Sequence, residues 1–193
     1  MTNDIRSCRT WQEVHDLARP GVSLGGWQTH GDNYAMYQGA LELLPADRAL
    51  IVGAYAGAQA ILLKMVRHEM DVWVIDPFTN DTEWKSNGRH LVDLYYDQLR
   101  IAGLEGKINT IQESSQSVGP TWDKSLRWLL IDGSHLEQDA YLDLHNFAPH
   151  VIVGGLMFLD DMNSTSQVPA AYKRWYQEEA ATERTWDILK KHD

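Results

Sequence analysis

The stretch LLIDGSHLEQDAYLDLHNFAPHVIVGGLMFLDDMN, residues 129–163, alternates apolar runs with a helix-like segment. It opens on an apolar run that stops at Asp132 and closes on another that stops at Asp160 and Asp161. Between these runs, residues 136–148 carry apolar side chains at helical spacing. A strand, a helix and a second strand in this order predict a βαβ unit whose two strands are parallel.

The same alternation extends over most of the chain. Strands are predicted over 48–54, 71–77, 107–112, 127–132 and 151–159, and helices over 32–44 (capped by Asp32), 58–70, 89–103, 136–148 and 168–181. Continuous apolar strands are typical of a sheet buried on both faces. The sequence therefore predicts an α/β fold of the Rossmann-like, doubly wound type, with a mostly parallel sheet and helices on both faces. Residues 182–193 leave room for one short strand, so the C-terminal strands are expected to be truncated.

Composition and charge exclude several classes of function. The 193 residues are enough for one domain with a sizeable core. A formal charge of −10 argues against a nucleic-acid partner and against an anionic membrane surface, because both need clustered Lys and Arg. Cys8 is the only cysteine, so an internal disulfide cannot form. The first twenty residues lack the apolar core of a signal peptide, and we expect a cytoplasmic protein.

Polar groups follow several predicted strands at the ends where open parallel sheets bind ligands. The glycine-rich turn GAYAG, Gly53 to Gly57, follows the first strand and opens a helix, and Asp76 ends the second strand. Such a turn lets the backbone approach a ligand, and an acid in the second position commonly binds ribose hydroxyls. The alternatives are a plain strand-to-helix turn and an acid that caps a helix or lies in solvent.

Three aspartates, Asp132, Asp160 and Asp161, end two further strands. Carboxylate oxygens are hard ligands that suit Mg²⁺ or another divalent cation, and like charges brought together call for such an ion. The alternative is three loop acids at the rim of the sheet. His135 lies three residues beyond Asp132, where it is placed to act as a base or to make a purely local hydrogen bond.

The stretch 129–163 resembles the pattern hhhDGdHsye…Dl…hhpGGhhhhDD of class I S-adenosylmethionine (SAM) methyltransferases. Within them it is similar to the metal-dependent sugar O-methyltransferases of the macrocin and aminocoumarin type, which are related to the cephalosporin-hydroxylase and rhamnosyl O-methyltransferase-like proteins. The segments LIVGAYAGAQAILL and VWVIDPF resemble the glycine turn and second-strand motif of the same family. The resemblance covers residues 26–163.

The resemblance implies a role for each matching residue. Gly53, Tyr55 and Gly57 would wrap the methionine end of SAM, Asp76 would hold its ribose, Ser115 would lie near the adenine, and Asp132, Asp160 and Asp161 would bind Mg²⁺. Asp132 would also be a candidate for the base that takes the proton from the acceptor. It is our first choice for this role because it is also expected to bind the metal, and His135, three residues further on, is the alternative. The metal would bind and acidify an acceptor hydroxyl, and a vicinal diol such as a sugar would chelate it. The family pattern is not matched at Ile51, Gln59 and Leu136.

We accordingly expect one class I methyltransferase-like domain over residues 1–193. It divides into an N-terminal helical segment (1–45), a SAM- and metal-binding core (46–165) and a C-terminal helix with a short strand (166–193). The expected activity is SAM-dependent, Mg²⁺-dependent O-methylation of a hydroxylated small molecule, and a homo-oligomer in which a paired subunit covers the sheet edge is compatible with it. The alternative hypotheses are a methyltransferase-like protein that binds a ligand or partner without catalysis, and another nucleotide-dependent enzyme such as an NAD-linked oxidoreductase. The missing GxGxxG motif counts against the latter.

Overall fold

A six-stranded sheet forms the centre of the part of the chain that the structure describes. The computed structural model describes residues 5–18, 20–22, 30–44, 47–79, 90–163, 165–179 and 187–188. The strands are β1 (Arg48–Val52), β2 (Asp71–Ile75), β3 (Asn109–Ile111), β4 (Leu126–Ile131), β5 (Val151–Leu159) and β6 (Asp187–Ile188). Their order is β3-β2-β1-β4-β5-β6, and every neighbouring pair is parallel. The order reverses between β1 and β4, which makes the carboxyl ends of these strands the switch point of a doubly wound sheet.

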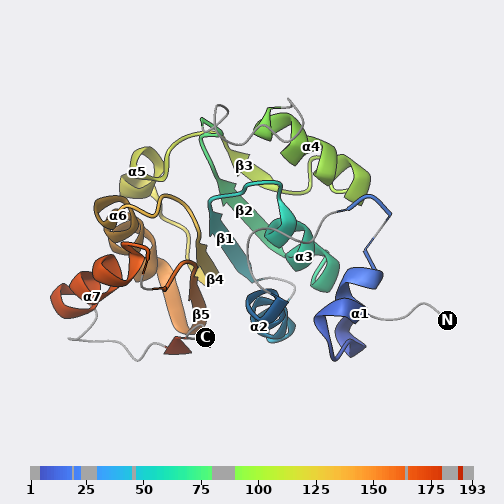
Figure 1. Cartoon of the computed structure of the whole chain (residues 1–193), viewed down its shortest axis with the longest axis horizontal. Helices are drawn as coiled ribbons and strands as arrows, with labels where there is room; N and C mark the ends of the chain where they lie inside the picture. Colours follow the sequence, from blue (N-terminus) through green and yellow to red (C-terminus); the bar gives the residue numbers. More distant parts are fainter. Residues whose placement is uncertain are drawn as a thin grey trace.

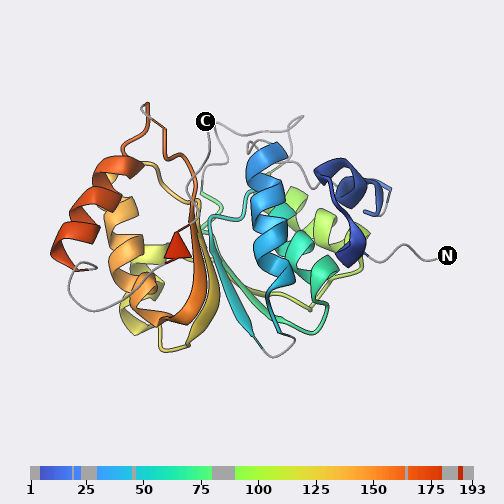
Figure 2. The same ribbon diagram turned by 90° about the horizontal axis from the view of Figure 1, so that it is seen from below.

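Helices cover both faces of the sheet, as the sequence predicts (Figure 1). They are α1 (Trp11–Asp16), α2 (His30–Leu41), α3 (Ala58–Val66), α4 (Leu91–Ala102), α5 (Ser115–Val118), α6 (Glu137–Phe147) and α7 (Val168–Glu178), with short 3₁₀ turns at Ile5–Ser7, Gly119–Thr121 and Ala148–His150. Figure 2 shows α2, α3 and α4 on one side of the sheet and α6 and α7 on the other. Among the described residues, no helix combines the length and apolar character needed to span a membrane.

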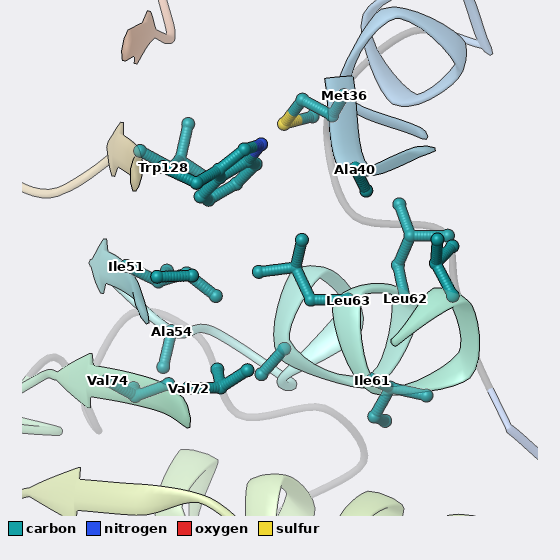
Figure 3. Packing of buried hydrophobic residues seen from close by; sticks show 14 of the residues in the cluster. Met36, Ala40, Ile51, Ala54, Ile61, Leu62, Leu63, Val72, Val74 and Trp128 are labelled. Atoms are coloured by element: carbon teal, nitrogen blue, oxygen red, sulfur yellow. The ribbon is translucent and has the colours of Figure 1, made fainter. Parts of the chain in front are cut away.

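Side chains that alternate along each strand divide the core into two layers. Ile51 of β1 and Trp128 of β4 pack with α2, α3 and α4, whereas Leu50 and Leu129 pack with α6 and α7. Figure 3 shows the first layer, in which Ile51, Val72, Val74 and Trp128 of three strands face Leu63 of α3 and Met36 of α2. Successive side chains of a strand point to opposite faces, so burial on both faces requires the unbroken apolar runs seen in the sequence.

The predicted strands and helices are confirmed, with differences at their ends. The helix predicted over 32–44 already includes His30, so Asp32 lies inside α2 and the prediction that it caps the helix is wrong. Helix α3 ends at Val66, where the buried ammonium group of Lys64 donates to carbonyls of the following turn. The short helix α1 was not predicted; it begins with a reciprocal capping box between Thr10 and Glu13.

Candidate functional site

The carboxyl ends of four adjacent strands form one continuous edge. Beyond the last residue of each strand, one more backbone hydrogen bond joins it to its neighbour: Asp76 N to Ile111 O, Gly53 N to Ile75 O, Asp132 N to Val52 O and Asp160 N to Ile131 O, at 2.8–3.2 Å. The glycine turn and the strand-ending aspartates therefore follow one another along this edge. Because these strands are parallel, the positions that follow them lie at the same edge of the sheet.

The glycine turn is packed against the neighbouring strand end so closely that only glycine fits. Gly53 has φ +91°, and a Cβ added there would lie 2.0 Å from the carbonyl oxygen of Asp132. Gly57 has φ +83° at the start of α3, and a Cβ added to it would lie 3.0 Å from the ring of Tyr95. The turn after β1 and the turn after β4 therefore pack directly against each other through their backbone atoms.

The Asp76 carboxylate fastens the glycine turn to the end of β2. Its Oδ2 accepts a 2.7 Å hydrogen bond from the backbone N–H of Ala54, and its Oδ1 accepts a 2.7 Å bond from that of Phe78. Each carboxylate oxygen has a second lone-pair site, so both bonds leave capacity to accept from a ligand hydroxyl. Asp76 thus shapes the turn in addition to the ribose-binding role expected from the sequence.

Backbone strain is concentrated at this edge. Tyr55, Phe78 and Asp161 are the non-glycine residues with positive φ among those described, at +44°, +51° and +53°. They follow β1, β2 and β5 at the same end of the sheet. Left-handed backbone at a non-glycine residue costs on the order of 1–3 kcal/mol, and it is found most often where a site needs a fixed geometry.

The side chains of His135 and Asp161 lie within hydrogen-bond distance at the edge. The Nδ1 atom of His135 lies 2.8 Å from Oδ2 of Asp161, and the Asn163 amide donates to Oδ1 of the same carboxylate at 3.1 Å. The left-handed backbone of Asp161 turns its side chain out of the line of β5, while Asp160 continues the backbone ladder. The histidine side chain is about half exposed, at 52%, so the pair is open to a ligand.

The structure does not bring the three aspartates of the predicted metal site together. All three lie in the described residues, and nowhere in that part of the chain do three or more His, Cys, Asp or Glu side chains gather closely enough to hold an ion. Adjacent side chains at a strand end diverge, and Asp161 is directed to His135 and Asn163. As the side chains are placed, Asp132, Asp160 and Asp161 do not fit a divalent cation, and the metal site stays a prediction.

Ser115 lies beyond β3, at the first position of α5, and its side chain is buried. Beside it is Asp143 of α6, which sequence reasoning missed and which is 0% exposed. Burial raises the pKa of the Asp143 carboxyl to about 7, and the nearby Ser115 hydroxyl opposes this effect. An acid three residues after Ala140 and four before Phe147 lies on the apolar face of its helix, and that spacing could have identified it.

The positions that depart from the family pattern have structural roles. Ile51 is 2% exposed and belongs to the core layer of α2 and α3, so it does not reach the edge. Gln59 is buried at the start of α3, where its amide donates to Oδ1 of Asn33 in α2 at 2.7 Å. Leu136 precedes α6 and is 58% exposed beside His135.

A hollow of about 440 Å³ lies at the other end of the sheet, where β4 and β5 begin. Asp123, Ser125 and the segment from Pro149 to Val153 line it. None of the predicted site residues is among them, so the strand-end edge remains the candidate site.

A protein-family model matches the region of the chain that contains the candidate site. Residues 50–162, more than half of the chain, match the family model described as "Methyltransferase domain". The match begins in β1 and ends just beyond Asp161, so it contains the glycine turn, Asp76, Asp132 and His135.

Solved methyltransferase structures share the fold at low sequence identity. An O-methyltransferase from Bacillus cereus in complex with SAH is 14% identical, with a TM-score of 0.55, over 82% of this chain and 72% of that one. An rRNA methylase from Streptococcus thermophilus is 12% identical, with a TM-score of 0.55, over 80% and 82%. The SAH-bound methyltransferase of Podospora anserina is 10% identical, with a TM-score of 0.53, over 78% and 59%.

These structures confirm the doubly wound class I fold, while the sugar O-methyltransferase subgroup stays a prediction. Because the family model matches more than half of the chain, from within β1 to just beyond β5, the chain belongs to the methyltransferase domain family.

Proposed function

We propose that this protein is a SAM-dependent O-methyltransferase that acts on a hydroxyl group of a small molecule. The observation that carries the proposal is the interlocked edge, where the Gly53 turn, the Asp76 carboxylate and the His135–Asp161 pair occupy consecutive strand ends. A glycine turn and an acid at successive strand ends suit the two ends of an adenosyl cofactor. The neighbouring histidine suits an acceptor whose proton must be removed.

The residues of the glycine turn fit the cofactor by their backbone. A turn that excludes a Cβ at Gly53 and holds Tyr55 in a left-handed conformation presents main-chain atoms at close range. The remaining acceptor capacity of Asp76 suits the two ribose hydroxyls. When bound, SAM would supply a methyl group activated by its sulfonium sulfur.

His135 is proposed to remove the proton from the acceptor hydroxyl. Donation from its Nδ1 to the Asp161 carboxylate leaves Nε2 free to accept, and the carboxylate stabilises the charge that the ring gains. With its proton removed, the acceptor oxygen would be able to displace SAH from the methyl group that bound SAM would supply. Asp132, at the adjacent strand end, stays a second candidate for the base.

No step is assigned to a divalent cation. The resemblance to metal-dependent enzymes predicts Mg²⁺ at Asp132, Asp160 and Asp161, but Asp161 would first have to leave His135 and Asn163. Turnover after exhaustive treatment with EDTA tests the predicted site. Transfer that persists would contradict it, and a loss of activity that Mg²⁺ restores would support it.

A small hydroxylated acceptor is favoured over RNA. Although some proteins of similar fold are rRNA methylases, a formal charge of −10 opposes association with a polyanion. A half-exposed histidine beside the exposed Leu136 provides a polar and an apolar contact for a compact acceptor. Sugars and other vicinal diols remain the first acceptors to examine, as the resemblance suggests.

The test begins with binding and proceeds to turnover. Calorimetric titration with SAM and SAH should give saturable binding at one site, and NADH should give none. A panel of catechols and sugars, monitored by release of SAH, then identifies the acceptor. Binding of NADH in place of SAM would favour an oxidoreductase, and binding of SAM without turnover on any acceptor would favour a protein that only binds. Absence of SAM and SAH binding would refute the proposal.

A further inference from the structure

Asp143 is a buried acid that the proposed transfer does not use. It lies on the face of α6 that packs against the sheet, and its side chain is 0% exposed. Neither of its carboxylate oxygens has a hydrogen-bond partner of normal geometry, although the Ser115 hydroxyl is near enough to favour the charged form. Nearly all buried polar groups in folded proteins are hydrogen-bonded, so an unpaired buried carboxyl requires an explanation.

The surroundings of Asp143 connect it to the candidate cofactor site. A Cβ added at Gly133 would lie 3.4 Å from Oδ2 of Asp143, so the carboxyl lies directly behind the turn that follows β4. Ser115 belongs to the turn that follows β3. One residue before Gly133, the carbonyl of Asp132 is the group against which Gly53 packs. The carboxyl thus lies next to the turns that follow β3 and β4, and the β4 turn itself packs against the glycine turn after β1.

The fold alone gives no reason for an acid at this position. Burial raises the pKa of Asp143 to about 7, which means that the surroundings oppose its charge. A carboxyl without partners destabilises the folded state, and a neutral side chain of similar size would cost less. A group that is unfavourable for folding but lies beneath a binding edge is typical of a site that trades stability for function.

We propose that Asp143 is a positioning residue for the nucleotide side of the cofactor site, where its carboxylate holds the Ser115 hydroxyl and the Gly133 turn in the arrangement that the adenosyl group binds. The inference rests on the proposed SAM-dependent function and extends it to a residue that is too buried to touch the cofactor. The cofactor itself makes no contact with Asp143 and binds to the turns that the carboxyl supports.

The experiment compares two neutral replacements, Asp143→Asn and Asp143→Ala, by thermal unfolding at pH 8 and by calorimetric titration with SAH. Without SAH, both variants should melt at a higher temperature than the wild type, because the unfavourable charge is gone. With SAH, their affinity should fall about 10- to 100-fold, the range for lost hydrogen bonds to a charged group. Asp139→Asn, which makes the same charge change on the same helix, should keep the affinity of the wild type.

Each other outcome overturns the inference. Unchanged SAH affinity in both variants would show that the carboxyl does not position the site. A lower melting temperature of both variants in the absence of SAH would assign Asp143 a structural role. If the wild type itself does not bind SAH, the proposed function fails, and the inference fails with it.

Discussion

The carboxylate of Asp76 joins two turns at the scale of a single side chain. One oxygen binds the N–H of Ala54 in the glycine turn, and the other binds the N–H of Phe78, whose backbone is left-handed. An asparagine at this position has one acceptor oxygen in place of two, so it cannot preserve both bonds. An asparagine of the same shape is therefore not enough to hold the two turns together, because both oxygens of the carboxylate are needed as acceptors.

Replacing Asp76 should weaken cofactor binding. Asp76→Ala removes the bonds that fasten the glycine turn, and we expect SAH binding measured by calorimetry to lose about 1–3 kcal/mol, with Asp76→Asn in the same direction. Asp71→Ala is the matched control, because Asp71 lies at the other end of β2 and pairs with Arg48. Equal affinities for the Asp76→Ala variant and the wild type would contradict the assignment.

The His135–Asp161 pair should behave as one unit in catalysis. On the acceptor found by the panel, His135→Ala should lower kcat by about 10²–10⁴-fold, the usual contribution of a general base. Asp161→Asn should also lower kcat. The double variant should be no slower than His135→Ala alone, because the Asp161 carboxylate acts only through the histidine ring.

A second pair in the molecule provides the control for this prediction. His145 Nδ1 lies 2.7 Å from Glu179 on the α6–α7 face, with side-chain exposures equal to those of the first pair. His145→Ala should leave kcat unchanged. If Asp161→Asn retains the kcat of the wild type, the carboxylate does not assist His135, and Asp132 becomes the better candidate for the base.

At the scale of elements, the turn between β1 and α3 depends on the absence of one methyl group. A Cβ at Gly53 would lie 2.0 Å from a backbone oxygen of the β4 turn, and neither backbone can move without breaking the ladder that joins the strands. The turn is therefore fixed by the neighbouring strand as much as by its own sequence.

Gly53→Ala should be far more destabilising than the same change elsewhere. Gly106 also has positive φ, at +65°, but has no atom within 4 Å of an added Cβ. Gly106→Ala should cost about 1–2 kcal/mol of unfolding free energy from backbone strain alone, and Gly53→Ala should add about 1–3 kcal/mol or more from the steric clash. Urea denaturation measures both, and equal losses would show that the β4 turn yields to the methyl group.

At the scale of the whole molecule, net charge bears on whether the acceptor is a small molecule or RNA. With a formal charge of −10, we expect no saturable binding to a short rRNA hairpin at physiological salt, and a dissociation constant weaker than about 10⁻⁴ M. Fluorescence anisotropy with a labelled hairpin measures this. Micromolar or tighter binding that weakens steeply with salt would point to a nucleic-acid substrate.

The architecture, and the placement of the candidate residues at one edge of the sheet, could be predicted from the sequence. The strands and most helices were predicted because their periodicity is local, and the parallel connection of βαβ units then brings Gly53, Asp76, Asp132 and Asp160 to one edge. The helix at Trp11–Asp16 was missed because it is short and its capping box was not recognised. The start of α2 was misplaced because an aspartate within the first turn resembles a cap.

The chemistry of the edge was decided by the tertiary structure. The sequence placed Asp161 with Asp132 and Asp160, but a left-handed backbone at Asp161 directs its carboxylate to His135. The second bond of Asp76 and the position of Asp143 behind Gly133 likewise depend on which turns pack together. A sequence specifies which strand end a side chain follows, because topology is set by long periodic segments. The partner of that side chain depends on a few backbone angles and on contacts between distant elements, which no local pattern encodes.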